Sequence, residues 1–133
     1  MLGAVDDWKK WALFTVPESG RWYDGSIGLL GDAVHAMLPF AAQGAGMAIE
    51  DAAVLARALG EGPAETAAQV TKALRRYRQL RRSRVAKVQT LAEKQGRIYH
   101  MSGPMAVARD LSIRMLGPKR VLARQRWIHD WKI

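Results

Sequence analysis

The chain has 133 residues, a hydrophobic content of 49%, no cysteine and a formal net charge of +9. This length provides one ordinary globular domain, and the lack of cysteine excludes disulfide bonds, thiolate metal sites and a cysteine nucleophile. No apolar run approaches the roughly 20 residues of a membrane-spanning helix, and Asp6 and Asp7 stand where a signal peptide is basic. We therefore expect a cytoplasmic protein without a membrane partner.

Strands are expected only near the start of the chain. Residues 1–25 are rich in aromatic side chains and are interrupted by proline and glycine, a pattern typical of one or two short strands joined by turns. Residues 26–30 are apolar and predict a buried strand, whereas residues 31–42 predict a loop. Because one or two strands do not form a stable sheet alone, this pattern indicates that sheet partners are missing.

Residues 44–59 predict a helix that ends at Gly60. Its apolar face is expected to comprise Ile49, Ala52, Ala53, Ala56 and Leu59, which recur at the spacing of helical turns. A long helix is expected over residues 64–99, and shorter ones over 105–116 and 119–127, separated by glycine-proline pairs. The fold class is therefore mostly α with a short β segment.

The long helix carries most of the positive charge. Residues 72–97 contain Lys72, Arg75, Arg76, Arg78, Arg81, Arg82, Arg84, Lys87, Lys94 and Arg97, opposed only by Glu93. Such a run can bind nucleic acid or an anionic surface, or it can be a solvated or intersubunit face. Tyr77 is the one aromatic residue among these cations, and no zinc-finger, RRM or KH signature occurs. We favour the solvated face; a small basic helical module that binds nucleic acid or protein without catalysis is the alternative.

A candidate ligand site lies between the predicted strand and the first predicted helix. Gly31 and Asp32 follow the strand, so the Asp32 carboxylate can accept hydrogen bonds from hydroxyl groups; a turn cap is the structural alternative. The helix opens with Gln43, Gly44, Ala45 and Gly46. A helix start of small residues exposes unpaired N–H groups and the positive end of the helix dipole. Together these groups predict a site for a polyhydroxylated, electron-rich ligand.

Several spaced elements recur here in one order: Gly-Asp-Ala-Val-His at residues 31–35, then Pro39, Gln43-Gly44 and Glu-Asp-Ala at residues 50–52. This series resembles the second flavin-binding segment of FAD-dependent aromatic hydroxylases, the single-component group that includes salicylate hydroxylase-like enzymes. Members begin with a nucleotide-binding Gly-x-Gly-x-x-Gly turn, which this sequence lacks. The resemblance therefore implies the C-terminal fragment of an α/β, Rossmann-like FAD-binding fold.

The resemblance also implies a cofactor site. Asp32, preceded by Gly31, would bind the ribityl chain of FAD, and Pro39 would lie beside the isoalloxazine ring. Backbone N–H groups after Gln43 would face the flavin pyrimidine edge, at Gly44, Ala45, Gly46 and Met47. NAD(P)H would be the reductant and a small aromatic compound the substrate of a monooxygenase reaction.

The resemblance also implies a division of the chain into three regions. Residues 1–30 would be the end of a substrate-domain sheet, residues 31–60 the second FAD-binding motif and its helix, and residues 61–133 a C-terminal helical region. A missing N-terminal nucleotide-binding domain would be the main partner, and a homodimer is allowed. We expect the isolated chain to bind FAD weakly or not at all and to be inactive.

No catalytic or metal-binding residue is assigned. His35, His100 and His129 have no acidic neighbours at ligand spacing. Glu50 and Asp51 are adjacent on the predicted helix and point about 100° apart, so they do not share a proton. We interpret both carboxylates as dipole and packing partners.

Overall fold

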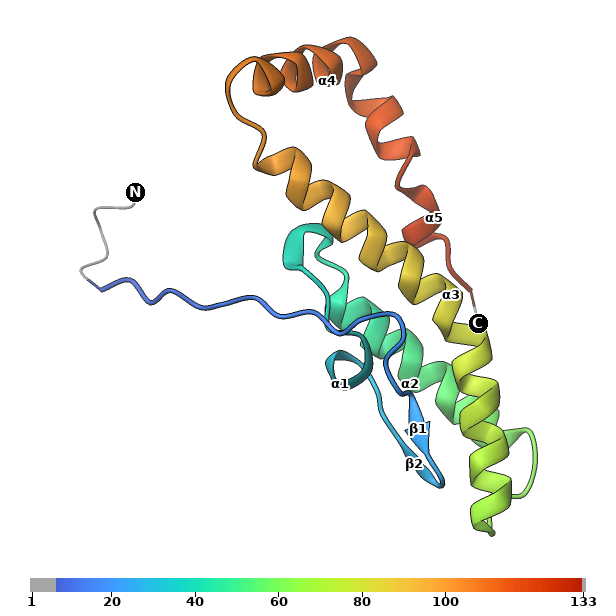
Figure 1. Ribbon diagram of the computed structural model, residues 1–133. Helices are drawn as coiled ribbons and strands as arrows, with labels where there is room; N and C mark the ends of the chain where they lie inside the picture. The colour runs from blue at the N-terminus through green and yellow to red at the C-terminus, as the bar shows by residue number, and fades with distance from the viewer. Residues whose placement is uncertain (1–6, 133) are drawn as a thin grey trace.

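The computed structural model describes residues 7–132 and is mostly helical with a short antiparallel hairpin, as the sequence predicts (Figure 1). Strand β1 (Tyr23–Asp24) pairs with β2 (Ile27–Gly28), with Tyr23 opposite Gly28 and Asp24 opposite Ile27. The remaining elements are α1 (Asp32–His35), the 3-10 turn η2 (Pro39–Ala41), α2 (Gly44–Gly60), α3 (Ala67–Tyr99), α4 (Gly103–Ala123) and α5 (Arg126–His129).

Helices α2 and α3 lie side by side, run in opposite directions and form the core (Figure 1). Thr66 begins α3 with a capping box, in which its hydroxyl accepts the Gln69 N–H and the Gln69 side chain accepts the Thr66 N–H. The buried apolar side chains between the two helices and the preceding loop include Trp22, Val34, Met47, Val54, Ala58, Ala73, Tyr77, Val85 and Val88. The segment that precedes α2 therefore packs against this helix pair.

The buried face of α2 differs from the predicted one. The helix buries Met47, Asp51, Val54 and Ala58, whereas Ile49 is 71% exposed and Ala52 and Ala56 are also exposed. The cause is the pairing of Asp51 with partners from α1 and α3, which turns a charged residue inward. The apolar pattern alone could not reveal this pairing, so the prediction for this face was wrong.

The predicted buried strand at residues 26–30 is also corrected. Strand β2 has two residues, Ile27 is 71% exposed, and Leu29 and Leu30 are partly exposed. Within residues 7–132 the hairpin has no further strand to cover it, so its apolar residues remain at the surface. The expected loop at residues 31–42 in turn contains two short helical turns, α1 and η2.

One glycine allows η2 to pack against α3. A Cβ atom on Gly96 would lie 2.6 Å from Cδ2 of Phe40, so only glycine admits the Phe40 ring at this point of α3. Phe40 also packs edge-on against the rings of Tyr99 and His100. This close approach fixes η2, which begins with Pro39, against the far end of the long helix.

The C-terminal region leaves α3, turns through α4 and returns to α3 at α5 (Figure 1). Helix α4 is kinked at Gly117, which has a φ of 69° in the left-handed region. Pro118 follows this glycine. The predicted helix at 105–116 is thus the part of α4 before the kink, and the predicted helix at 119–127 comprises the rest of α4 and the start of the short α5. Among the described residues, no helix is long and apolar enough to cross a membrane.

Candidate functional site

The loop between β2 and α2 brings Asp32 beside the start of α2. Gly31 has φ 58° and ψ −135°, and Asp32 then begins the single turn of α1. After η2, Ala42 adopts a left-handed conformation, and Gln43 occupies the N-cap position of α2 without a hydrogen bond from its side chain. A Cβ atom on Gly44 would lie 3.9 Å from Oδ1 of Asp32, so the carboxylate and the helix start are close neighbours.

The backbone N–H groups in the first turn of α2, next to Asp32, have no hydrogen-bond partner from a capping side chain. No side chain caps Gly44, Ala45 or Gly46 with a hydrogen bond, as expected for the first three residues of a helix. Asp32 and Ala45 are exposed, and Gly44 and Gly46 are partly exposed. An exposed carboxylate therefore lies next to three unpaired N–H groups, which is a donor and acceptor set suited to a polar ligand.

Met47 does not take part in this open donor set. Its N–H donates to the Gln43 carbonyl at 2.8 Å, and its side chain is completely buried. The remaining two predicted site residues lie at the margin: Pro39 is exposed at the start of η2, and Gln43 is partly buried at the helix cap. The structure thus brings together Asp32 and residues 44–46, and gives Met47 a role in the core.

A buried ionic cluster lies directly behind this loop. Asp51 is fully buried; its Oδ2 lies 2.5 Å from Nε2 of His35 and accepts the Gly31 N–H at 3.2 Å. Nε of Arg81, from a side chain only 1% exposed, donates to the other oxygen at 2.7 Å. Burial alone would raise the pKa of Asp51, but hydrogen bonds from His35 and Arg81 outweigh it, so this pKa lies below its usual value.

Sequence reasoning missed this cluster. The available signal was Arg81 itself, which interrupts the apolar stripe of α3 between Tyr77 and Val85, both of them buried. An arginine on a buried stripe needs a carboxylate partner. Tyr77 lies next to the cluster, where burial and the charge of Asp51 raise its pKa.

Glu50 extends the cluster toward the C-terminus. It accepts hydrogen bonds from Arg81 at 2.6 Å and from Arg84 at 2.5 and 2.6 Å. Arg84 also donates to the Ile128 carbonyl at 2.8 Å, and Trp131 lies against the guanidinium groups of both arginines. Glu50 and Asp51 therefore share Arg81, and the Glu50–Arg84 contact connects the cluster to the C-terminal segment.

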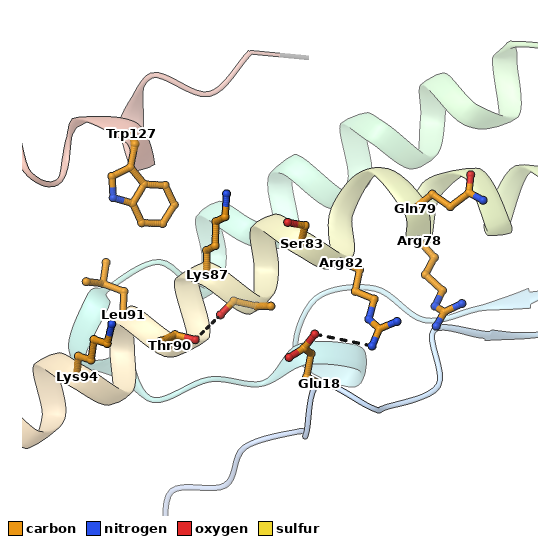
Figure 2. Close-up of a pocket in the computed structure, with 11 residues that line it drawn as sticks. Glu18, Arg78, Gln79, Arg82, Ser83, Lys87, Thr90, Leu91, Lys94 and Trp127 are labelled. Atoms are coloured by element: carbon orange, nitrogen blue, oxygen red, sulfur yellow. Dashed lines mark hydrogen bonds and ion pairs between the residues drawn. The ribbon is translucent and has the colours of Figure 1, made fainter.

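A second candidate surface is a groove of about 730 Å³ along α3 (Figure 2). Its cations are Arg78, Arg82, Lys87 and Lys94, and Trp127 lies across from Lys87 and Leu91. Glu18 opposes them and pairs with Arg82 at 3.7 Å. The groove has the charge to attract an anion, but its four cations all come from the single helix α3. Among residues 7–132 there is no cluster of three or more potential metal ligands.

Comparison with known proteins places the loop and the helix pair in one family. The family model described as an FAD binding domain matches residues 7–92, which include Asp32, the start of α2 and the ionic cluster. This match supports the flavin motif rather than an unrelated basic helical module.

The curated relatives are oxygenating enzymes of aromatic compounds. The chain is 40% identical over 114 residues to 3-amino-4-hydroxybenzoate 2-monooxygenase of Streptomyces platensis, covering 85% of this chain and 28% of that protein. It is 41% identical over 106 residues to 3-hydroxybenzoate 6-hydroxylase 1 of Aquipseudomonas alcaligenes, covering 79% and 26%. It is 40% identical over 98 residues to a salicylate hydroxylase of Pseudomonas putida, covering 74% and 22%.

The chain thus spans about a quarter of the length of these relatives. The matched region contains the spaced glycines, the carboxylates, α2 and most of α3. On this evidence the chain belongs to the family of FAD binding domains, and it is similar to part of aromatic hydroxylases such as salicylate hydroxylase.

Proposed function

We propose that this chain supplies the ribityl and pyrimidine contacts for FAD in a monooxygenase that hydroxylates an aromatic substrate. The observation that carries the proposal is the proximity of the exposed Asp32 carboxylate to the uncapped first turn of α2. Family membership supports it, because the matched region contains both groups. In this proposal Gly31, Asp32, Pro39, Gln43, Gly44, Ala45 and Gly46 form the site, and Met47 supports it from the core.

The donor and acceptor set of the site fits a flavin. The Asp32 carboxylate accepts hydrogen bonds from ribityl hydroxyls, while the N–H groups of residues 44–46 donate to the pyrimidine oxygens and nitrogens. The positive end of the α2 dipole stabilises negative charge at that edge by roughly 0.3–2 kcal/mol. When FAD is bound it supplies the oxygen chemistry, and the protein orients it and the substrate.

The finer assignments are parts of the same proposal. NAD(P)H serves as the reductant, and a small aromatic compound is the substrate. Residues 1–30 belong to the end of a substrate-domain sheet, residues 31–60 to the second FAD-binding motif, and residues 61–133 to a C-terminal helical region. A nucleotide-binding domain, supplied by sequence outside these residues, provides the pyrophosphate and adenine contacts, and a homodimer is compatible with the exposed apolar face of α4.

Nuclear magnetic resonance tests the proposed contacts in the 133-residue chain, since amide shifts detect weak binding. We expect FAD to shift the amide signals of Asp32 and of residues 44–46 first, and Asp32→Asn to reduce these shifts strongly. Asp24→Asn is the matched control, because Asp24 is an exposed carboxylate on β1. Shifts confined to the basic groove of α3, or an Asp32→Asn variant that binds like the unmodified chain, would remove the proposed site.

A further inference from the structure

The backbone before Asp32 is held in an unusual conformation from outside the loop. Gly31 has φ 58°, and a Cβ atom on it would lie 3.1 Å from Cβ of Ala48. Its N–H donates to Oδ2 of Asp51, twenty residues further along the chain. The residue that determines the direction of Asp32 is therefore fixed by glycine geometry, by contact with α2 and by one buried carboxylate.

The same oxygen of Asp51 also forms a hydrogen bond at the C-terminal end of α1. Oδ2 of Asp51 lies 2.5 Å from Nε2 of His35, the last residue of α1. A four-residue helix is not stable by itself. Because residues 31 and 35 both form hydrogen bonds with Asp51, the turn between them is fixed at its two ends. Asp32 lies in this turn and is exposed at the surface.

The geometry assigns protons within this cluster. Nδ1 of His35 is buried and has no hydrogen-bond partner among residues 7–132, so a proton there would be unsatisfied. Nε2 faces the Asp51 carboxylate, which only accepts, so Nε2–H is the donor in this contact. Arg81 compensates the charge of Asp51 at 2.7 Å. Asp51 is thus held by His35 at one carboxylate oxygen and by Arg81 at the other.

We propose that Asp51 is a positioning residue for the flavin contact of Asp32, acting through Gly31 and His35 and held in place by Arg81. This role rests on the proposed function, because it concerns the affinity of the Asp32 site for FAD. A purely structural role for the cluster would affect the stability of the fold and leave the affinity of the folded protein unchanged. The two roles are therefore separable by experiment.

The test uses the 133-residue chain with FAD as the ligand. Asp51→Asn removes the charge that Arg81 compensates, and this can prevent folding, so His35 provides the decisive variants. His35→Leu removes the donor to Asp51, whereas the side-chain amide of His35→Gln can replace it. Val88→Ala is the control, because Val88 is completely buried on α3 and belongs to the same core without a polar contact.

Two measurements are made on each variant: the amide proton shift of Gly31 without ligand, and the dissociation constant for FAD from the titration. We expect His35→Leu to shift the Gly31 signal and to raise the dissociation constant at least about tenfold. His35→Gln should restore both values to within about threefold of the unmodified chain. Val88→Ala should lower the melting temperature and leave the Gly31 signal and the dissociation constant unchanged.

The outcomes separate this inference from the proposed function. If FAD does not bind to the unmodified chain at any concentration, the proposed contacts fail, while the Gly31 signal still reports whether His35 and Asp51 position the loop. An unshifted Gly31 signal in folded His35→Leu overturns the positioning role. So does a loss of affinity in Val88→Ala as large as that in His35→Leu, because destabilisation would then explain both.

Discussion

At the scale of single residues, the molecule uses two carboxylates in opposite ways. Asp32 is exposed beside an uncapped helix start, whereas Asp51 is buried and bonded to Gly31, His35 and Arg81. A buried ion pair contributes little net stability against an apolar alternative, but removing one partner costs about 3–5 kcal/mol. The value of Asp51 therefore lies in the geometry that it imposes on the loop.

The lowered pKa of Asp51 predicts acid sensitivity. Because its folded pKa lies below the ordinary aspartate value of 3.8, the ionised carboxylate stabilises the fold above that value, and this stability is lost as the pH falls further toward the folded pKa. We expect the melting temperature to fall as the pH drops below about 4, and the hydrogen bond to the Gly31 amide to weaken in parallel. Thermal unfolding followed by circular dichroism measures the first effect. An Asp51→Asn variant that folds should lack this component, and an unchanged acid profile in that variant would contradict the assignment.

At the scale of elements, α3 has two unlike faces. One face buries Arg81 in the ionic cluster, and the other presents the cations of the groove, where only Glu18 opposes them (Figure 2). Two of the arginines that looked like part of one basic run, Arg81 and Arg84, are in fact paired with Asp51 and Glu50. The charge available to an external partner is accordingly smaller than the sequence suggests.

The groove should bind nucleic acid only through non-specific electrostatics. We expect binding of a short RNA or DNA duplex to weaken steeply as the salt concentration rises and to show no sequence preference. Fluorescence anisotropy measures both properties. The double variant Lys87→Glu/Lys94→Glu should weaken binding more than the control double variant Arg120→Glu/Arg124→Glu. The control makes the same charge change at the exposed Arg120 of α4 and the exposed Arg124 that follows this helix. Sequence-preferring binding at physiological salt would instead favour the basic-module function.

At the scale of the whole molecule, several apolar surfaces are left uncovered. Among the described residues, Trp8 and Trp11 of the N-terminal segment are exposed, as are Leu111 and Met115 of α4. Exposed apolar side chains in such numbers mark interaction surfaces. The chain spans about a quarter of the relatives it matches, which agrees with surfaces that pack against further sequence.

A chimera tests the role of the chain in a complete enzyme. Residues 7–132 replace the matched region of the Pseudomonas putida salicylate hydroxylase, to which the chain is 40% identical over 98 residues. We expect this chimera to retain FAD, and the isolated chain to bind it weakly, since only the former has the pyrophosphate and adenine contacts. In the chimera, Asp32→Ala should weaken FAD binding by about 1.5–3 kcal/mol through the loss of charge-assisted hydrogen bonds.

Flavin absorbance after gel filtration measures the retained cofactor in this experiment. Asp24→Ala serves as the control, because it removes an exposed carboxylate on β1. Equal retention in the two variants would exclude Asp32 from the site, and sub-micromolar binding to the isolated chain would contradict the need for the missing contacts.

Local patterns in the sequence were enough for the helical content, the limits of α2, the end of α3 and the flavin motif, whereas α3 begins at Ala67, three residues after the predicted start. Helix starts, glycine stops and the order of Gly31, Asp32 and Gly44 depend on near neighbours, which a sequence displays directly. The inward face of α2, the short exposed β2 and the burial of Arg81 were not accessible in this way. The face of α2 and the burial of Arg81 depend on partners sixteen to thirty residues away, since Asp51 turns inward only because His35 and Arg81 compensate its loss of water. The exposure of β2 depends on the lack of a further strand beside it among the described residues. Whether a polar residue is buried is decided by such distant partners, and so only by the tertiary structure.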